Sequence, residues 1–322
     1  MDRAISSKSN NNLYLIIAII VILLLSLISL FTGAYDILGQ KDGWDMFFIT
    51  RVPRTIALML SGAAMAIAGL VMQLLTQNRF VEPTTSGTSE WAGLGLMVSF
   101  LLLPSPTLLQ RMIFTIVFSF IGTMVFFLLL KRIRLKSSLM VPVIGIMLGA
   151  IVSAVSTFLG LLFSMTQSME DWFQASFAPI QKGRYEFLWL IIIFTALIYL
   201  YADRITLAGL GKSVATNLGL NYNKIILIGT ALVSITVGIV AAVVGNLPFI
   251  GLIVPNIVSL IRGDNLKSNL IWVSLFGMGI ISLCDIIARL VIRPFELPVS
   301  LILGSFGALV FIFLLLIQRK AR

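Results

Sequence analysis

The 322-residue sequence is 59% hydrophobic and only 11% charged, and its mean hydropathy is +1.06. Soluble domains keep about a quarter of their residues charged, so this composition excludes an ordinary soluble protein. The net charge of +10 would suit a nucleic-acid partner, but the basic residues flank apolar runs and form no single polar face. The sequence therefore predicts an integral membrane protein with no nucleic-acid partner.

Ten apolar stretches predict an all-helical protein with about ten transmembrane helices. A helix needs ~20 residues to cross ~30 Å of hydrocarbon, and backbone in lipid must satisfy its own hydrogen bonds. The shorter stretches are expected to be tilted, packed inside the bundle or only partly spanning. We expect residues 13–322 to form one transmembrane domain, after a disordered cytoplasmic tail at residues 1–12. The stretches cover about residues 13–35, 55–75, 92–109, 112–130, 139–163, 187–201, 225–244, 247–261, 270–292 and 297–317.

The distribution of basic residues predicts the orientation of the chain. If the N-terminus lies inside and ten spans alternate, 15 Lys and Arg residues fall inside and eight outside. The excess inside predicts that both termini are cytoplasmic. The first stretch is followed by Tyr35-Asp36 and not by a clear A-x-A cleavage site, so we expect it to stay as an uncleaved span.

The outside set holds more arginines than insertion alone would favour. Arg51 and Arg54 open the second stretch, and Arg289 and Arg293 close the ninth. Snorkelling would explain one or two of them, whereas an exposed cluster suits docking of an acidic partner outside the membrane. Asp285 lies four residues before Arg289, so an intrahelical ion pair is the simpler interpretation of these two. A functional intramembrane charge is the alternative.

Small residues line one side of the second stretch. Gly62, Ala66 and Gly69 are spaced i, i+4 and i+7, which lets transmembrane helices approach closely. Tight packing is the structural interpretation, and a face that lines a pathway is the functional one. Gly145 and Gly149 in the fifth stretch have the same two interpretations.

Neither catalysis nor a resident cofactor is indicated. Gly211-Lys212-Ser213 ends like a phosphate-binding loop, but Thr206 occupies the position of its first glycine, and no strand precedes it. The chain has no histidine and one cysteine, Cys284, so the commonest metal ligand and proton shuttle is absent. We expect no catalytic residue, metal site or cofactor.

The segment from Leu207 to Asn221 is the longest polar interruption on the inner side. Lys212, Ala215, Leu218 and Gly219 fit a short helix that lies across the membrane surface. It is either an ordinary connector or the element that a cytoplasmic partner holds.

Motifs from about residue 45 onward resemble the permease subunits of binding-protein-dependent ABC importers for iron–siderophores, haem and vitamin B12. They occur in the family's order and at its spacing. They are Arg51-Val52-Pro53-Arg54, a small-residue helix ending at Met72-Gln73, Asn78-Arg79-Phe80-Val81-Glu82-Pro83, the stretch from Gly211 to Gly219, Phe249 to Pro255, and Asp285 to Leu290 followed by Glu296 to Pro298.

The resemblance implies roles for individual residues. It implies that Arg51, Arg54 and Arg289 receive acidic residues of an external binding protein. Arg293 is assigned to the same docking site because it lies at the same end of the ninth stretch as Arg289. The segment around Gly211, Lys212, Ala215, Leu218 and Gly219 corresponds to a coupling helix that sits in a groove of the ATPase. Asn78 and Phe80 correspond to the cytoplasmic gate.

Three positions depart from the family pattern and put contact details in doubt. Lys212 stands where many members carry an acid, Arg79 replaces a proline, and Asn256 follows Pro255 where histidine is common.

The sequence is thus expected to encode a permease subunit in the bacterial cytoplasmic membrane that imports a ferric siderophore by alternating access. Its expected partners are a cytoplasmic ATPase dimer, an external substrate-binding protein and a second permease subunit, identical or paralogous. Haem and vitamin B12 are alternative substrates. An ion-coupled secondary transporter is the rival from another class, although the sequence shows no clear inverted repeats or broken helices. For a membrane-embedded enzyme, no nucleophile or acid–base group is evident.

Overall fold

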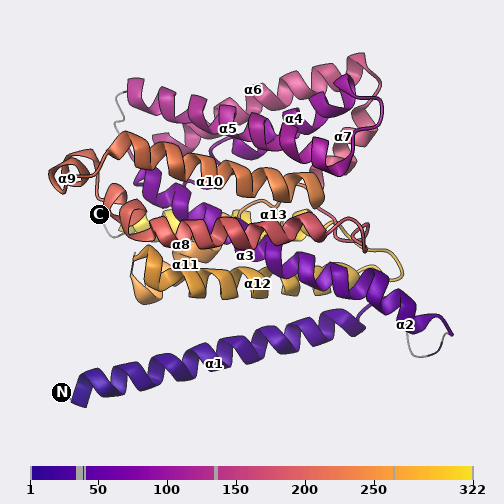
Figure 1. Ribbon diagram of the computed structural model, residues 1–322, viewed down its shortest axis with the longest axis horizontal. Helices are drawn as coiled ribbons and strands as arrows, with labels where there is room; N and C mark the ends of the chain where they lie inside the picture. The colour runs from indigo at the N-terminus through magenta and orange to yellow at the C-terminus, as the bar shows by residue number, and fades with distance from the viewer. Residues whose placement is uncertain (1, 34–38, 40, 134–136, 264, 321–322) are drawn as a thin grey trace.

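The computed structural model describes residues 2–33, 39, 41–133, 137–263 and 265–320 (Figure 1). These residues are almost entirely helical, and the one β-bridge among them joins Gln174 and Asn246. The elements are α1 (Asp2–Phe31), α2 (Gly43–Met46), η1 (Phe47–Arg51), α3 (Val52–Thr76), α4 (Thr88–Leu102), α5 (Leu108–Arg132), α6 (Met140–Leu162), α7 (Thr166–Phe173), η2 (Glu186–Trp189), α8 (Leu190–Gly209), α9 (Lys212–Asn217), α10 (Tyr222–Val243), α11 (Ile250–Arg262), α12 (Leu266–Leu290) and α13 (Val299–Lys320).

Ten apolar helices correspond to the ten predicted stretches. In the described part of the chain, seven helical segments are long and apolar enough to cross a membrane, and three shorter apolar helices accompany them: α4, α11 and residues 299–313 of α13. The boundaries differ where sequence signals are weak. The stretch predicted at 92–109 ends as a helix at Leu102, and the stretch predicted at 187–201 continues as α8 to Gly209.

The first helix is longer than expected. We expected a disordered tail at residues 1–12, but α1 begins at Asp2 and runs without a break to Phe31. Met1 lies outside the described residues, as do Tyr35 and Asp36 of the expected uncleaved junction.

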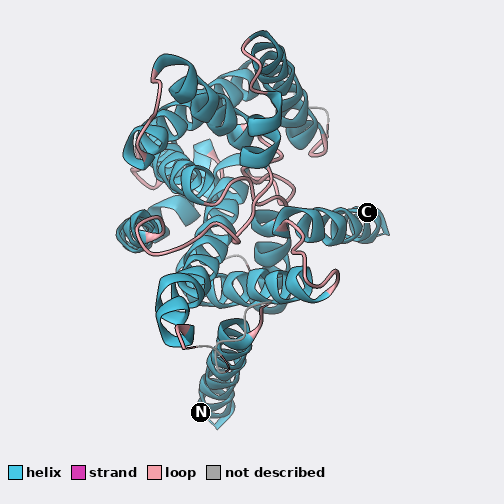
Figure 2. Cartoon of the chain, turned by 90° about the vertical axis from the view of Figure 1, so that its right-hand side faces the viewer, coloured by secondary structure: helices cyan, strands magenta, loops and turns pink. Residues whose placement is uncertain are grey.

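The helices run roughly along the long axis of the molecule (Figure 1). Both termini lie at the same end as the short helix α9, whereas α2 and α7 lie at the opposite end. We name these the α9 end and the α7 end. An even number of crossings puts both termini on one side, in agreement with the predicted count. Figure 2, turned by 90°, shows α1 at the edge of the bundle.

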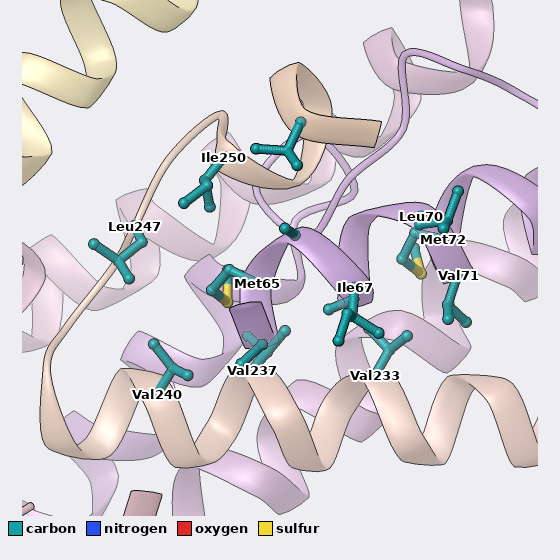
Figure 3. Close-up of a cluster of buried hydrophobic side chains, with 14 of the residues drawn as sticks. Met65, Ile67, Leu70, Val71, Met72, Val233, Val237, Val240, Leu247 and Ile250 are labelled. Atoms are coloured by element: carbon teal, nitrogen blue, oxygen red, sulfur yellow. The ribbon is translucent and has the colours of Figure 1, made fainter. Parts of the chain in front are cut away.

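Helix α3 forms the centre of the bundle and packs against α8, α10, α11 and α12. Its Met65, Ile67, Leu70, Val71 and Met72 are almost completely buried. In Figure 3 they lie beside side chains of α10 and of the connection that leads into α11; the labelled ones are Val233, Val237, Val240, Leu247 and Ile250.

Glycines explain how the neighbours of α3 come so close. A Cβ atom at Gly62 would lie 2.6 Å from the carbonyl oxygen of Gly277 in α12. One at Gly69 would collide with the backbone of Gly251 in α11. The predicted small-residue face therefore packs against two helices, and backbone meets backbone at both crossings.

Two helices in the bundle are too short to cross a membrane alone. Helices α4 and α11 have 15 and 13 residues, and both begin at fully buried positions, Thr88 and Ile250. The non-helical segments 77–87 and 244–249 lead into them. Irregular backbone is tolerated at membrane depth only where the protein buries and satisfies it. No sequence pattern predicted these interruptions.

The close helix contact at Gly69 predicts that a larger side chain at this position destabilises the protein. Gly69→Ala should lower the free energy of unfolding by about 1–3 kcal/mol, because the added methyl group overpacks a backbone contact. Gly279→Ala in α12 is the matched control, since no atom lies within 4 Å of its added Cβ. Thermal unfolding of the purified protein in detergent measures both. Equal midpoints for the two variants would contradict the close α3–α11 contact.

Candidate functional site

Residues singled out from the sequence gather at both ends of the bundle. At the α7 end lies the arginine cluster, which we define as Arg51, Arg54, Asp285, Arg289 and Glu296. Toward the α9 end lie the gate segment, residues 77–87, and the coupling segment, residues 210–220.

Asp285 is the centre of the arginine cluster. Its Oδ1 accepts a hydrogen bond from Arg54 Nη2 at 2.7 Å, and its Oδ2 pairs with Arg289 one helical turn later. Arg54 Nη1 also lies 2.7 Å from Glu296 Oε2. The predicted pair of Asp285 and Arg289 is therefore confirmed, within a larger network that joins α3, α12 and the connection to α13.

The cluster also holds the end of α1. Arg289 Nη1 donates to the carbonyl oxygens of Ser29 at 2.9 Å and Thr32 at 2.7 Å, and Arg51 Nη1 donates to the Thr32 oxygen at 2.6 Å. The last carbonyls of a helix have no intrahelical partners and carry partial negative charge. Two guanidinium groups supply partners for α1 at this position.

Burial changes the interpretation of the arginines. Arg54 and Arg289 are only 7% and 3% exposed, so the expectation of exposed cations is wrong for these two. Their charges are balanced inside the protein, because burying an unpaired charge is costly. Arg51 is half-buried, and Arg293 is exposed.

The gate segment is tied down through its own side chains. Asn78 Oδ1 accepts from the Phe80 amide at 2.9 Å, and Asn78 Nδ2 donates to the Ser138 carbonyl. The buried Phe80 ring meets Phe311 of α13 edge-on, with centroids 5.8 Å apart. The two predicted gate residues therefore lie together, at a contact between the gate segment and α13.

Glu82 joins the gate segment to the N-terminus of α11. Its side chain is completely buried, and its Oε1 accepts from the Phe249 amide at 2.9 Å and from the Thr84 hydroxyl. A carboxylate is favourable here because the first amides of a helix are unpaired and carry partial positive charge. Glu82 Oε2 has no hydrogen-bond partner in the described structure.

Two departures from the family pattern meet in the structure. Asn256 Nδ2 donates to the Arg79 carbonyl at 2.8 Å, so α11 holds the gate segment at a second point. Gln73 of α3 adds a contact to Gly251 at 3.3 Å. The gate segment and α11 are thus connected as one unit.

The coupling segment forms the expected short helix. Gly219 has φ +77°, and the Gly219 and Leu220 amides donate to the Thr216 and Ala215 carbonyls, which closes α9 with a Schellman motif. Ala215 is fully buried, whereas Leu218 is 58% exposed. The exposed apolar residues recur every four positions, at Leu210, Val214 and Leu218, and Lys212 is also exposed.

Gln77 connects the coupling segment to the gate segment. It ends α3 in a left-handed conformation with φ +52°. Its side chain lies against Gly211, where an added Cβ would be 3.6 Å from Gln77 Nε2, and it is also near the Tyr222 side chain at the start of α10. Asn78 follows Gln77 directly in the chain, so one residue separates the contact with Gly211 from the gate segment's first hydrogen bonds.

The sequence analysis gave no role to Gln77, and it named Glu82 only as one residue of a motif. Glu82 lies within a motif that carried the resemblance, but its role depends on a partner 167 positions away. Gln77 carried a local signal, because a polar residue directly follows the last apolar turn of the second stretch. No group of three or more His, Cys, Asp or Glu side chains that could hold a metal occurs among the described residues.

Comparison with known proteins agrees with this arrangement. The family model described as "FecCD transport family" matches residues 9–317. The chain belongs to the FecCD transport family. It is therefore a multi-pass membrane permease, and the predicted helical fold class and family are confirmed. The cytoplasmic location of both termini stays a prediction.

Two curated relatives and one solved structure illustrate the similarity. The petrobactin import system permease protein FatD of Bacillus anthracis is 71% identical over 307 residues, covering 95% of this chain and 92% of the relative. The petrobactin import system permease protein YclN of Bacillus subtilis is 42% identical, with coverages of 92% and 96%. An inward-facing metal-chelate type ABC transporter shares the fold at a TM-score of 0.79, with 24% identity over 92% of this chain and 97% of that one.

The arginine cluster predicts a large effect of one neutral substitution. Asp285→Asn leaves Arg54 and Arg289 buried beside a neutral amide, so the free energy of unfolding should fall by about 3–5 kcal/mol. Arg293→Gln, at an exposed position of the same region, should leave it unchanged within about 0.5 kcal/mol. Thermal unfolding in detergent distinguishes the two. A stable Asp285→Asn variant would show that the cluster contributes little to folding.

Proposed function

We propose that this chain is the permease subunit of an ABC importer that carries a ferric siderophore across the bacterial cytoplasmic membrane. Ferric petrobactin is the proposed substrate, supported by the 71% identity to a relative named for petrobactin import. Relatives named for vitamin B12 import are more distant, at 31% identity for that of Citrobacter koseri. Haem and vitamin B12 are therefore the less favoured substrates.

The connection from α9 through Gln77 to the gate segment is the observation that carries the mechanism. In this mechanism, ATP-driven closure of two separate ATPase subunits pushes α9. Gln77 passes the shift to Asn78 and Phe80, and the contacts of Glu82 and Asn256 make α11 move with them. The Phe80–Phe311 contact then opens or closes the pathway.

The surface of the coupling segment suits an ATPase groove. Leu210, Val214 and Leu218 offer an apolar strip that burial in a partner would remove from water. Lys212 supplies a positive charge beside it, so we expect an acidic residue at the rim of the groove. No ATP is hydrolysed by this chain itself in the proposed mechanism.

The binding protein is proposed to dock at the arginine cluster. Arg293 is exposed and Arg51 is half-buried, so these two reach acidic groups of the partner directly. Arg54 and Arg289 act indirectly, because their ion pairs hold α1, α3 and α12 in place beneath the contact.

A second permease subunit completes the proposed pathway. The exposed face of α6 is apolar but includes Ser153 and Thr157, and that of α13 includes Ser305. Small polar groups in an otherwise apolar face suit a wide, weakly binding passage better than a lipid-facing surface. The chelate would pass intact, because the chain offers no histidine and its one cysteine is buried.

An ion-coupled secondary transporter is the second candidate, and two observations favour it. Helices α4 and α11 begin at buried positions, and Glu82 and Glu90 each have a buried oxygen without a hydrogen-bond partner in the described structure. Interrupted helices are typical of such carriers, and buried carboxylates occur in the proton relays of transporters.

Reconstitution separates the two candidates. With the ATPase, the loaded binding protein and ATP, liposomes should concentrate ferric petrobactin. The permease alone, under a sodium or proton gradient, should concentrate nothing. The control is an ATPase variant that binds but does not hydrolyse ATP, which should abolish uptake. Accumulation that depends only on an ion gradient would overturn the proposed function.

Gln77→Ala should uncouple transport from ATP hydrolysis. Removal of the amide that lies against Gly211, a polar contact worth about 0.5–1.5 kcal/mol, should lower uptake roughly two- to tenfold. ATP hydrolysis by the assembled complex should persist. Thr216→Ala, on the exposed side of α9, is the control that should retain coupling. Equal ratios of uptake to hydrolysis in the two variants would contradict the role of Gln77.

A further inference from the structure

A polar cavity at the α7 end lies outside both regions described above. Its volume is about 550 Å³, within the range of small-molecule sites. The ends of α4, α5 and α10 form its walls together with α7 and the connection from Gln174 to Arg184. The arginine cluster contributes no residue to it.

Two arginines face this cavity against one acid. Arg111 is held in place, because its Nε donates to the Pro106 carbonyl at 3.0 Å and its guanidinium carbon lies 4.4 Å from the centroid of the Phe100 ring. These contacts leave Nη1 and Nη2 for another partner. Arg184 is exposed, lines the same cavity and repels Arg111 electrostatically. Among the lining residues that the structure describes, Asp171 is the one acid, so these residues carry a net positive charge.

The inner side of the cavity is apolar and leads to unpartnered polar groups. Leu96, Ala241 and Gly245 line both this cavity and a small void beneath it. The void is also lined by Ser89 and Asn246, whose Oγ and Oδ1 atoms have no hydrogen-bond partner in the described structure. Ser89 is only 4% exposed. Buried groups of this kind are normally satisfied, and the void of about 10 Å³ has room for one water molecule that would satisfy them.

We propose that this cavity binds an oxyanion-bearing arm of the transported chelate, a carboxylate or catecholate. Arg111 and Arg184 would hold the oxygens through charge-assisted hydrogen bonds, and the apolar side would cover the body of the arm. This inference rests on the proposed function for its source of ligand. The chemistry itself, an organic anion of small size, follows from the cavity.

The alternative source of a carboxylate is an acidic side chain of the binding protein. The size of the cavity favours the chelate, because a single Asp or Glu side chain would leave most of about 550 Å³ unfilled.

The first test does not depend on transport. Saturation-transfer NMR measures binding of citrate and benzoate to the purified permease–ATPase complex, with benzamide as the uncharged match to benzoate. Saturable binding of the anions is expected, weakened roughly tenfold or more in an Arg111→Gln/Arg184→Gln variant. Lys182→Gln, on the same connection but outside the cavity lining, should bind them like the unaltered protein. No saturable binding, or equal binding by benzamide, overturns the proposal.

The second test separates the two sources of the anion. Maximal uptake of ferric petrobactin into proteoliposomes is measured at saturating binding protein, and the affinity of docking is measured on the same preparation. The double variant should lose roughly tenfold or more of the uptake and keep its docking affinity. Unchanged uptake, or a loss that follows docking affinity, overturns the assignment to the chelate. If the unaltered importer transports no ferric siderophore although anions bind, the proposed function fails and the anion site stands.

Discussion

The structure depends on satisfying irregular backbone that is buried at the centre of a membrane protein. Residues 78–87 are not helical, and most of them are inaccessible to solvent. No water or lipid can supply their hydrogen bonds, so side chains do. Asn78 and Thr85 bond groups within the segment, and Glu82 and Asn256 bond it to α11. The same bonds that make this backbone tolerable also attach it to a neighbouring helix.

This attachment indicates which parts of the molecule are rigid and which can move. Glycine contacts at Gly62 and Gly69 hold α3 against α12 and α11 with almost no room for adjustment. The end of α3, by contrast, turns through a left-handed Gln77 and continues as a segment held by directional hydrogen bonds. Close-packed interfaces shift as units, whereas hydrogen bonds can exchange partners. Movement is therefore expected at the gate segment, and α11 can follow it only by pivoting about its contact with Gly69, against a core of α3 and α12.

The sequence predicted the helices well because lipid imposes a simple rule on length and hydrophobicity. The ten stretches and the small-residue face around Ala66 follow from local pattern alone. The burial of Arg54 could not be predicted in this way, because its partners Asp285 and Glu296 are more than 200 positions away. Glu82 presents the same difficulty, since a single acid near a span edge gives no sign that a helix N-terminus lies opposite. The polar composition of residues 2–12 gave no indication that α1 would extend through them.

The pairing of Arg54 with Asp285 also has a consequence for biogenesis. The two residues are 231 positions apart, so α3 leaves the ribosome long before its counter-charge has been synthesised. Until α12 is inserted, the guanidinium of Arg54 has to remain in the headgroup region, with α3 shifted toward that surface. Helix α3 can therefore reach its final position in the bundle only during the last quarter of translation, and the anchoring of α1 depends on the same step. A chain truncated before α12 should accumulate as an immature intermediate that quality-control proteases recognise.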